Sequence, residues 1–352
     1  MSKSVPAASS ACVSDARVIA RTLVCYREPS SVRSVVELVI TLGPLILIWA
    51  AMGAALKLGY PAITVVLALP AAGFLLRTFL IQHDCGHGSF FPTRRANDWV
   101  GRVLAVLTLT PYDYWRRTHA AHHAGAGNLD RRGMGDVDTF TVREYAALPL
   151  WRRVVYRLYR HPAVLFGLGP AYLFFLQNRI PFGLTRAGMQ PWISTMGTNL
   201  ALGLAIGLAI WLLGWWHFLV LYVPVTLLAA SAGVWLFYVQ HQFEHTLWQK
   251  DQSWDALEAA LHGSSHYDLP PVLRWITANI GVHHVHHLAS RVPYYRLQQV
   301  LRDHPELRGV GRLTLRQSLG CVRLSLWDEE RDQLVSFRDA RSRMLPVAPA
   351  FT

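Results

Sequence analysis

The feature of this sequence that most restricts its fold is a run of 57 residues, Ala187 to Phe243, without a single Asp, Glu, Lys or Arg. A helix needs about 20 apolar residues to cross about 30 Å of hydrocarbon, so this run is long enough for two crossings. Gly-Trp-Trp-His at 214–217 predicts the turn between them, because tryptophan favours the membrane–water interface. We therefore expect two spans, near residues 195–213 and 217–239.

A second pair of charge-free runs lies near the N-terminus, at Val39–Leu56 and Leu58–Leu76, with the turn-forming Gly59-Tyr60-Pro61 close to their junction. Two weaker apolar stretches, 103–112 and 162–178, are too short or too interrupted by proline and glycine to cross, and we expect interfacial or re-entrant helices there. The sequence thus predicts an all-α integral membrane fold, with four transmembrane helices in two hairpins plus interfacial helices.

The distribution of charge predicts the orientation of these spans. Between residues 94 and 160 there are twelve arginines and six acidic residues, whereas the two hairpin turns hold one lysine and no arginine. Positive segments stay in the cytoplasm, so we expect both termini and the histidine clusters on that side. The net charge of +12 would also suit nucleic acid, but we find no nucleic-acid motif and expect no such partner. We expect cytosolic segments at 1–34 and 305–352, and a membrane domain at 35–304.

Most of the sixteen histidines are clustered. The three main clusters are His-Asp-Cys-Gly-His at 83–87, His-Ala-Ala-His-His at 119–123 and His-His-Val-His-His at 283–287. A looser pair, His241 and His245, lies at the end of the last expected span. Residues three or four apart share one side of a helix, so HxxxH directs two imidazoles, and HxxHH three, toward one region.

Converging imidazoles indicate a metal site. The three clusters supply eight rings in these patterns, and His241 or His245 supplies a ninth. One ion rarely takes more than six ligands, so this number indicates two ions, which imidazole would allow to be zinc, copper, iron or nickel. Isolated histidines are more often ordinary interfacial or surface residues, and we expect that role for His161, His217 and His304. His262 and His266 stay open.

At these clusters the chain resembles the membrane fatty acid desaturase family, in particular bacterial acyl-lipid desaturases related to the plant delta-12 type. The family pattern is HxxxH, HxxHH and a later HxxHH, which appears here in the same order. GDVDTF at 135–140, VQHQFEH at 239–245 and ANIGVHHVHHLASRVPYYRL at 278–297 also resemble this family. The resemblance covers roughly residues 35–300.

The resemblance implies a cytosolic cap that binds two iron ions (Fe2+/Fe3+) and uses O2 as co-substrate. Its implied iron ligands are His83, His87, His119, His122, His123, His241, His283, His286 and His287. His245 is a competing candidate for the ninth position, and His284 falls off the pattern. Nearby candidates to orient the rings are Asp84, Asp113, Asp136, Asp138, Glu244 and Asn279. Aromatic candidates for an acyl tunnel are Trp115, Trp235 and Phe237.

The implied reaction is the desaturation of a lipid-linked acyl chain at the cytoplasmic face of a bacterial inner membrane. The sequence has no dinucleotide fingerprint and no haem-attachment motif, so we expect a separate electron donor, such as a ferredoxin-like carrier. Two alternatives stay open. A related di-iron enzyme could hydroxylate acyl, alkane or carotenoid substrates, and a membrane metal transporter or sensor could also carry cytosolic histidines.

Overall fold

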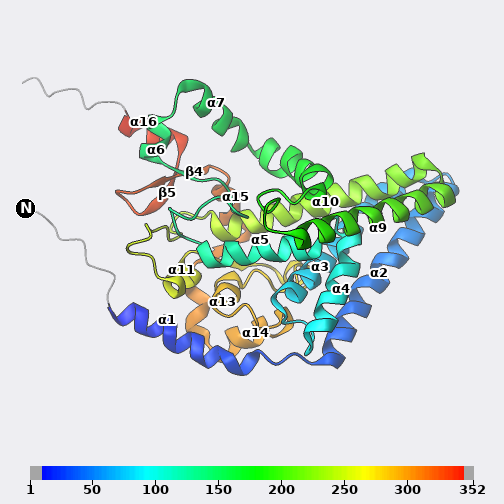
Figure 1. The fold of residues 1–352 in the computed structure, drawn as a ribbon, viewed down its shortest axis with the longest axis horizontal. Helices are drawn as coiled ribbons and strands as arrows, with labels where there is room; N and C mark the ends of the chain where they lie inside the picture. Colours follow the sequence, from blue (N-terminus) through cyan, green and yellow to red (C-terminus); the bar gives the residue numbers. More distant parts are fainter. Residues whose placement is uncertain (1–9, 345–352) are drawn as a thin grey trace, which may run out of the picture.

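The computed structural model describes residues 10–344, with side chains from 16 to 341. Residues 1–9 and 345–352, the outer ends of the two expected cytosolic segments, lie outside this range. Four helices are long and apolar enough to cross a membrane. They are α2 (Ser31–Lys57), α3 (Pro61–His87), α9 (Met189–Leu213) and α10 (Trp215–His241). The expected four spans in two hairpins are therefore confirmed, and Figure 1 shows them extending together from one end of the molecule.

Local sequence explains where these helices begin and end. Ser30 caps α2 by accepting a hydrogen bond from the backbone N–H of Arg33. Pro61 opens α3, where its missing N–H is not needed. Gly88 ends α3 with φ 68°, and Gly214 joins α9 to α10 with φ 83°, both in the left-handed region that favours glycine. Because α3 ends just after the first histidine cluster, that cluster occupies the last turns of a transmembrane helix.

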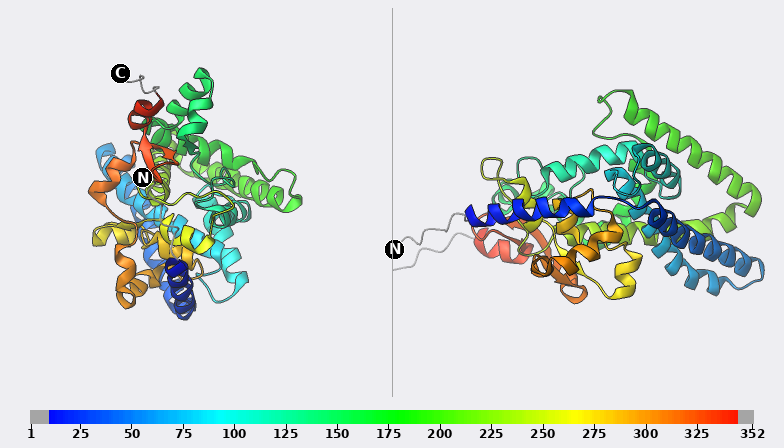
Figure 2. Two further views of the ribbon diagram at one scale, coloured as in Figure 1. Left: turned by 90° about the vertical axis from the view of Figure 1, so that its left-hand side faces the viewer. Right: turned by 90° about the horizontal axis from the view of Figure 1, so that it is seen from below.

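Helix α3 is the centre of the bundle, and it packs against α2, α4 and α10. Half of its most apolar window is buried, compared with 6% of that of α9, which leaves α9 available to lipid. Figure 2 shows α9 at the outer edge of the four long helices. Helix α2 begins at Ser31 rather than at Val39, and α3 continues past Leu76 to His87. Both extensions carry charged residues, which the charge-free criterion had left outside the spans.

Short helices and strands before, between and after the two hairpins form the cap. Its N-terminal and central elements are α1 (Ser10–Thr22), η1 (Leu23–Tyr26), α4 (Arg94–Leu107), α5 (Tyr112–Gly125), β1 (Phe140–Thr141), α6 (Val142–Ala147) and α7 (Leu150–Tyr159). The later elements are α11 (Ala256–His262), β2 (His266–Asp268), α12 (Pro271–Ile276), α13 (His283–Leu288), α14 (Tyr294–Asp303) and η5 (Pro305–Gly309). Helices α5 and α13 carry the second and third histidine clusters.

The two weaker apolar stretches do not form spans. Residues 103–112 are not a helix of their own, because they comprise the end of α4, a turn and the start of α5. Residues 162–178 form a chain of short helical pieces whose first members pack on α10. These pieces are η2 (Val164–Leu168), α8 (Gly169–Ala171), η3 (Tyr172–Leu176) and η4 (Gln177–Arg179).

The C-terminal part of the cap contains short strands that the sequence reasoning did not predict. Its elements are β3 (Arg312–Thr314), α15 (Leu315–Cys321), β4 (Leu324–Asp328), β5 (Gln333–Ser336) and α16 (Phe337–Met344). Strand β4 pairs antiparallel with β5 and parallel with β1, where Phe140 faces Leu326. Strand β3 pairs parallel with β2. These pairings connect the C-terminal part of the cap to β1, which follows the second histidine cluster, and to β2, which precedes the third.

Candidate metal centre

Five histidine rings from three helices form the first group. They are His83 and His87 of α3, His119 and His123 of α5, and His286 of α13. One ligand nitrogen of each lies within 4.8 Å of the others. The Nε2 atom of His119 is 3.0 Å from that of His83 and 3.0 Å from that of His87. The Nε2 of His123 is 3.1 Å from that of His119 and 3.2 Å from that of His286.

A second group lies beside the first. His122 of α5, His241 of α10 and His287 of α13 converge in the same way. The Nε2 atom of His241 is 3.1 Å from that of His122 and 3.1 Å from that of His287. His283 adjoins this group, with its Nε2 3.1 Å from that of His287. The two groups touch where the rings of His123 and His287 stack, with their centroids 4.1 Å apart.

Helical geometry explains how one cluster serves both groups. Positions four apart differ by about 40° around a helix and positions three apart by about 60° in the other direction. On α5, His119 and His123 therefore face the first group while His122 turns to the second. On α13 the assignment is reversed. His283 and His287, four residues apart, lie at the second group, and His286 joins the first. The sequence predicted that these rings converge, but not this division.

The ring nitrogens within each group are arranged to bind a metal ion rather than to hydrogen-bond one another. A neutral imidazole has one N–H donor and one acceptor nitrogen, so several Nε2 atoms aimed at a common point cannot all satisfy one another. Nitrogen ligands about 2.1 Å from a metal and at right angles to each other are about 3.0 Å apart. The observed separations of 3.0–3.2 Å match that spacing.

The environment keeps these rings neutral, which metal binding requires. Burial lowers the pKa of His119 well below its ordinary value, and the neighbouring His123 lowers it further. Burial likewise lowers the pKa of His286 and of His287. At neutral pH these three rings therefore present unprotonated nitrogens.

Two of the expected orienting carboxylates contact histidine rings. An oxygen of Asp84 lies 3.3 Å from Nδ1 of His83, and Asp136 contacts Nδ1 of His122 directly. His241 is oriented by a backbone group instead of a carboxylate, since its Nδ1 lies 2.9 Å from the carbonyl oxygen of Phe237. Such partners at the second ring nitrogen fix the orientation of a metal-binding imidazole.

The other carboxylate and amide candidates either pair with groups other than the histidines or are exposed. Asp113 pairs with Arg102, with a shortest distance of 2.9 Å, and Asp138 and Glu244 are exposed. The side-chain nitrogen of Asn279 donates to the backbone oxygen of Tyr294 at 3.3 Å. The short sequence distance of these residues from the histidines had suggested contacts that the fold does not make.

Two of the three aromatic candidates lie against the histidine groups. Trp115 stacks on His119, with centroids 4.5 Å apart and planes 15° apart. Gly86 leaves room for this indole, because a Cβ there would lie 2.8 Å from it. Phe237 packs against the rings of both His122 and His241 and helps to line a hollow beside the second group. Trp235 instead packs on Phe166, with centroids 5.1 Å apart.

The remaining histidines lie outside both groups. His245, the competing candidate for the ninth position, is exposed, and because α10 ends at His241 the two do not share one helical face. His284 turns away from both groups, with Nε2 3.0 Å from the backbone oxygen of Leu307, and burial lowers its pKa to about 3. His161 is exposed. His217, His262 and His304 are half-buried.

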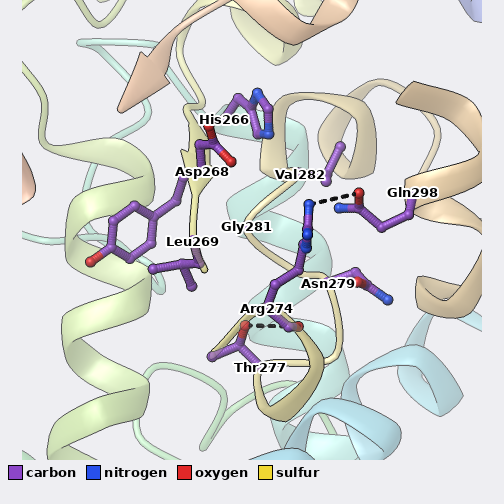
Figure 3. Close-up of a pocket in the computed structure, with 10 residues that line it drawn as sticks. His266, Asp268, Leu269, Arg274, Thr277, Asn279, Gly281, Val282 and Gln298 are labelled. Atoms are coloured by element: carbon purple, nitrogen blue, oxygen red, sulfur yellow. Dashed lines mark hydrogen bonds between the residues drawn. The ribbon is translucent and has the colours of Figure 1, made fainter. Parts of the chain in front are cut away.

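His266 belongs to a separate pocket. Figure 3 shows it on one wall, with Arg274, Asn279 and Gln298 opposite. Its Nδ1 lies 2.8 Å from the backbone oxygen of Arg308, and Arg274 donates to Gln298 at 3.3 Å. The hydrogen bonds of these polar groups are thus made within the cap, and His266 faces neither histidine group.

The different positions of His241 and His245 give a paired prediction. We expect His241→Ala to reduce the metal content of the purified protein by about one ion per chain, because it removes a central nitrogen of the second group. His245→Ala should keep the wild-type metal content. Elemental analysis of both proteins checks this, and a larger loss in His245→Ala than in His241→Ala would contradict the assignment.

The lowered histidine pKa values predict instability in acid. An unfolded histidine has a pKa near 6.5, so below that pH the unfolded chain binds protons that the buried rings of the cap do not. The free energy of unfolding should therefore fall as the pH drops below about 6.5, and bound metal should be released over the same interval. Titration of metal content and melting temperature between pH 8 and pH 4.5 tests this, and a protein that gains stability in acid would contradict it.

Comparison with known proteins agrees with this arrangement. The fatty acid desaturase family model matches residues 58–318, which include all nine histidines of the two groups. A fatty acid desaturase of Bacillus subtilis (strain 168) is 41% identical over 94% of this chain and 93% of its own length. An sn-1 acyl-lipid omega-3 desaturase (ferredoxin) of Synechocystis sp. is 30% identical over 63% of this chain. An sn-1 oleoyl-lipid 12-desaturase of the same strain is 26% identical over 64% of this chain.

The chain spans 61% and 63% of the length of the two Synechocystis relatives, but nearly all of the Bacillus protein. The matched family region covers α3, α9 and α10 together with the histidine groups, and the match to the Bacillus relative extends over 94% of this chain. The chain therefore belongs to the fatty acid desaturase family.

Proposed function

We propose that this protein is an O2-dependent desaturase that introduces a double bond into a lipid-linked acyl chain at a histidine-bound pair of irons. The observation that carries the proposal is the convergence of nine imidazoles into two adjacent groups. His83, His87, His119, His123 and His286 would hold one iron. His122, His241, His283 and His287 would hold the other.

The pair of irons would supply the reductive activation of dioxygen that removal of hydrogen from an unactivated methylene requires. The chain itself holds the ligands in place. Asp84, Asp136 and the carbonyl of Phe237 fix the second ring nitrogens of three of them. Burial keeps His119, His286 and His287 neutral, and a site closed to water limits side reactions.

The four apolar helices support a substrate that is itself part of the membrane. We propose that an acyl chain approaches the histidine groups along the ends of α3 and α10, because His83, His87 and His241 lie in the last turns of these helices. Trp115 and Phe237 are the apolar rings in direct contact with the histidines, and we propose that they guide the chain. The names of the two Synechocystis relatives, both acyl-lipid desaturases, support a lipid-linked substrate.

We propose that a separate carrier supplies the two electrons that each turnover needs. The name of one relative specifies ferredoxin, which supports a ferredoxin-like or similar carrier as the donor here. The arginine-rich segment at 94–160 offers positive charge for docking it. We place the active site at the cytoplasmic face of a bacterial inner membrane, with 35–304 as the membrane domain between cytosolic segments 1–34 and 305–352.

The proposal is tested by expression in a bacterial host that lacks acyl desaturation. We expect new unsaturated chains in the membrane lipids, with the double bond at one position by mass spectrometry. A hydroxylated chain at that position would favour the hydroxylase alternative. Tightly bound zinc without consumption of dioxygen would favour the transporter or sensor. His161→Ala is the matched control, because this exposed ring lies outside both groups.

A further inference from the structure

A buried ion pair joins the two helices of the first hairpin, in the half of α3 that ends with the first histidine cluster. Glu37 of α2 and Arg77 of α3 are each 1% exposed, and their side chains are in direct contact. Arg77 also donates from Nε to Thr41 at 3.0 Å and lies 4.2 Å from the ring centre of Trp275. Burial of two charges is costly, and a well-packed apolar pair is often equally stable. Stability alone therefore does not explain why a charged pair occupies this position, and its contacts indicate a further role.

Tyr294 connects the ion pair to a histidine. Its hydroxyl lies 3.0 Å from an oxygen of Glu37 and 3.5 Å from the guanidinium of Arg77. Its backbone N–H donates to one oxygen of Asp84 at 2.7 Å, and the other oxygen of Asp84 lies 3.3 Å from Nδ1 of His83. Positions 77 and 84 lie on the same face of α3, about 10 Å apart along its axis, and Tyr294 bridges them.

This path joins two histidine clusters that are far apart in sequence. Helix α13, with the third cluster, ends at Leu288, and a short loop leads from it to Tyr294 at the start of α14. The contact between Tyr294 and Asp84 therefore ties the segment after the third cluster to the first cluster. The rings of His83 and His286, one from each cluster, have their centroids 4.6 Å apart in the first group.

We propose that Glu37, Arg77 and Tyr294 form a clamp that positions Asp84 and, through it, His83 in the first metal site. They are positioning residues, since none of them touches the ring nitrogens that face the metal. The inference rests on the proposed metal centre. Loss of a partner that orients a metal-bound histidine typically lowers metal affinity about 10- to 100-fold, so a loosened clamp should show itself as faster loss of one iron.

The test compares iron release from the purified, iron-loaded protein to an excess of chelator at neutral pH. Tyr294→Phe removes only the hydroxyl and keeps both the ring, which stacks on Phe90, and the backbone N–H. We expect one of the two irons to leave roughly fivefold faster, because the hydrogen bond between the Tyr294 hydroxyl and the Glu37 carboxylate is lost. The effect is moderate because Tyr294 still donates its backbone N–H to Asp84. Asp84→Asn should act more strongly, about 10- to 100-fold, since one amide oxygen cannot serve both His83 and Tyr294.

Tyr26→Phe is the matched control. The Tyr26 hydroxyl also donates to a carboxylate, that of Asp303 at 2.9 Å, but it lies off the path to His83. Its iron release should equal that of the wild type. Glu37→Gln gives a second perturbation of the clamp that keeps the shape of the side chain, and it should also speed the release of one iron.

A Mössbauer spectrum of the 57Fe-loaded proteins separates positioning from general loosening. In Tyr294→Phe and Asp84→Asn, the signal of one iron should change while the other keeps its wild-type parameters. Wild-type release rates in both Tyr294→Phe and Glu37→Gln, or equal changes in both iron signals, would overturn the clamp. A wild-type protein that holds no histidine-bound iron would overturn the proposed metal centre and the clamp together.

Discussion

Replacing His122 with alanine is expected to abolish double-bond formation, with a loss of at least about a hundredfold, because a metal ligand matters more than its orienting partners. His122 is the α5 ring that turns into the second group, where its Nε2 lies 3.1 Å from that of His241. Its other nitrogen is held by Asp136. Alanine therefore removes one nitrogen of the second group and leaves the Asp136 carboxylate without its ring.

Membrane lipids from cells that express each variant at equal levels provide the measurement. His161→Ala should retain wild-type unsaturation, because that ring is exposed and contacts neither group. Asp136→Asn should fall between the two, since it keeps the metal-facing nitrogen of His122 but weakens its orientation. Wild-type unsaturation in the His122→Ala strain would contradict the assignment of this residue to the metal centre.

Replacing Arg77 with methionine is expected to destabilise the protein by about 3–5 kcal/mol, the usual consequence of leaving a buried charge without its partner. For a chain of this size, such a loss should lower the melting temperature in detergent by roughly 10 °C. Glu37 would keep a contact with Arg33 at 2.6 Å, but that arginine is 54% exposed and offers weaker compensation than the buried guanidinium.

The double variant Glu37→Leu with Arg77→Met tests this explanation. It replaces both charges with apolar side chains, so it should melt closer to the wild type than Arg77→Met alone does. Thermal unfolding of the three proteins, followed in one detergent, provides the comparison. A double variant as unstable as the sum of its two single changes would show that the pair is not coupled.

Much of the fold could be predicted from two patterns. Charge-free runs located the four spans, because hydrocarbon tolerates few ions. The same criterion misplaced the ends of α2 and α3, since Glu37, Arg77 and Asp84 lie inside these helices. Their charges are accommodated by each other and by Tyr294, whose position depends on packing with a segment some 200 residues away along the chain. A local reading of the sequence cannot detect such a partner.

The candidate site could be predicted in content but not in arrangement. Spacing of three and four residues shows that rings share one side of a helix, and nine histidines do converge. Spacing does not show which neighbour each ring faces, so the division of 119–123 and 283–287 between two groups required the packing of α5 and α13. His241 and His245 could not be separated either, since no proline or glycine in the sequence marks the end of α10 between them.

The short strands of the cap could not be predicted from the sequence. Strands β1, β4 and β5 are short, from two to five residues, and their pairing brings together segments near residues 140, 326 and 335. Strands of this length contain too few alternating apolar and polar residues to be distinguished from loops. They matter to the site because β1 follows Asp136, the partner of His122, by a few residues.

We propose that nine histidines bind two irons at neighbouring positions. Anomalous X-ray scattering at the iron absorption edge, from crystals of the full-length protein, tests it most directly. We expect two iron peaks, one enclosed by His83, His87, His119, His123 and His286 and the other by His122, His241, His283 and His287. Iron peaks elsewhere in the molecule, or no iron at either position in an active preparation, would contradict it.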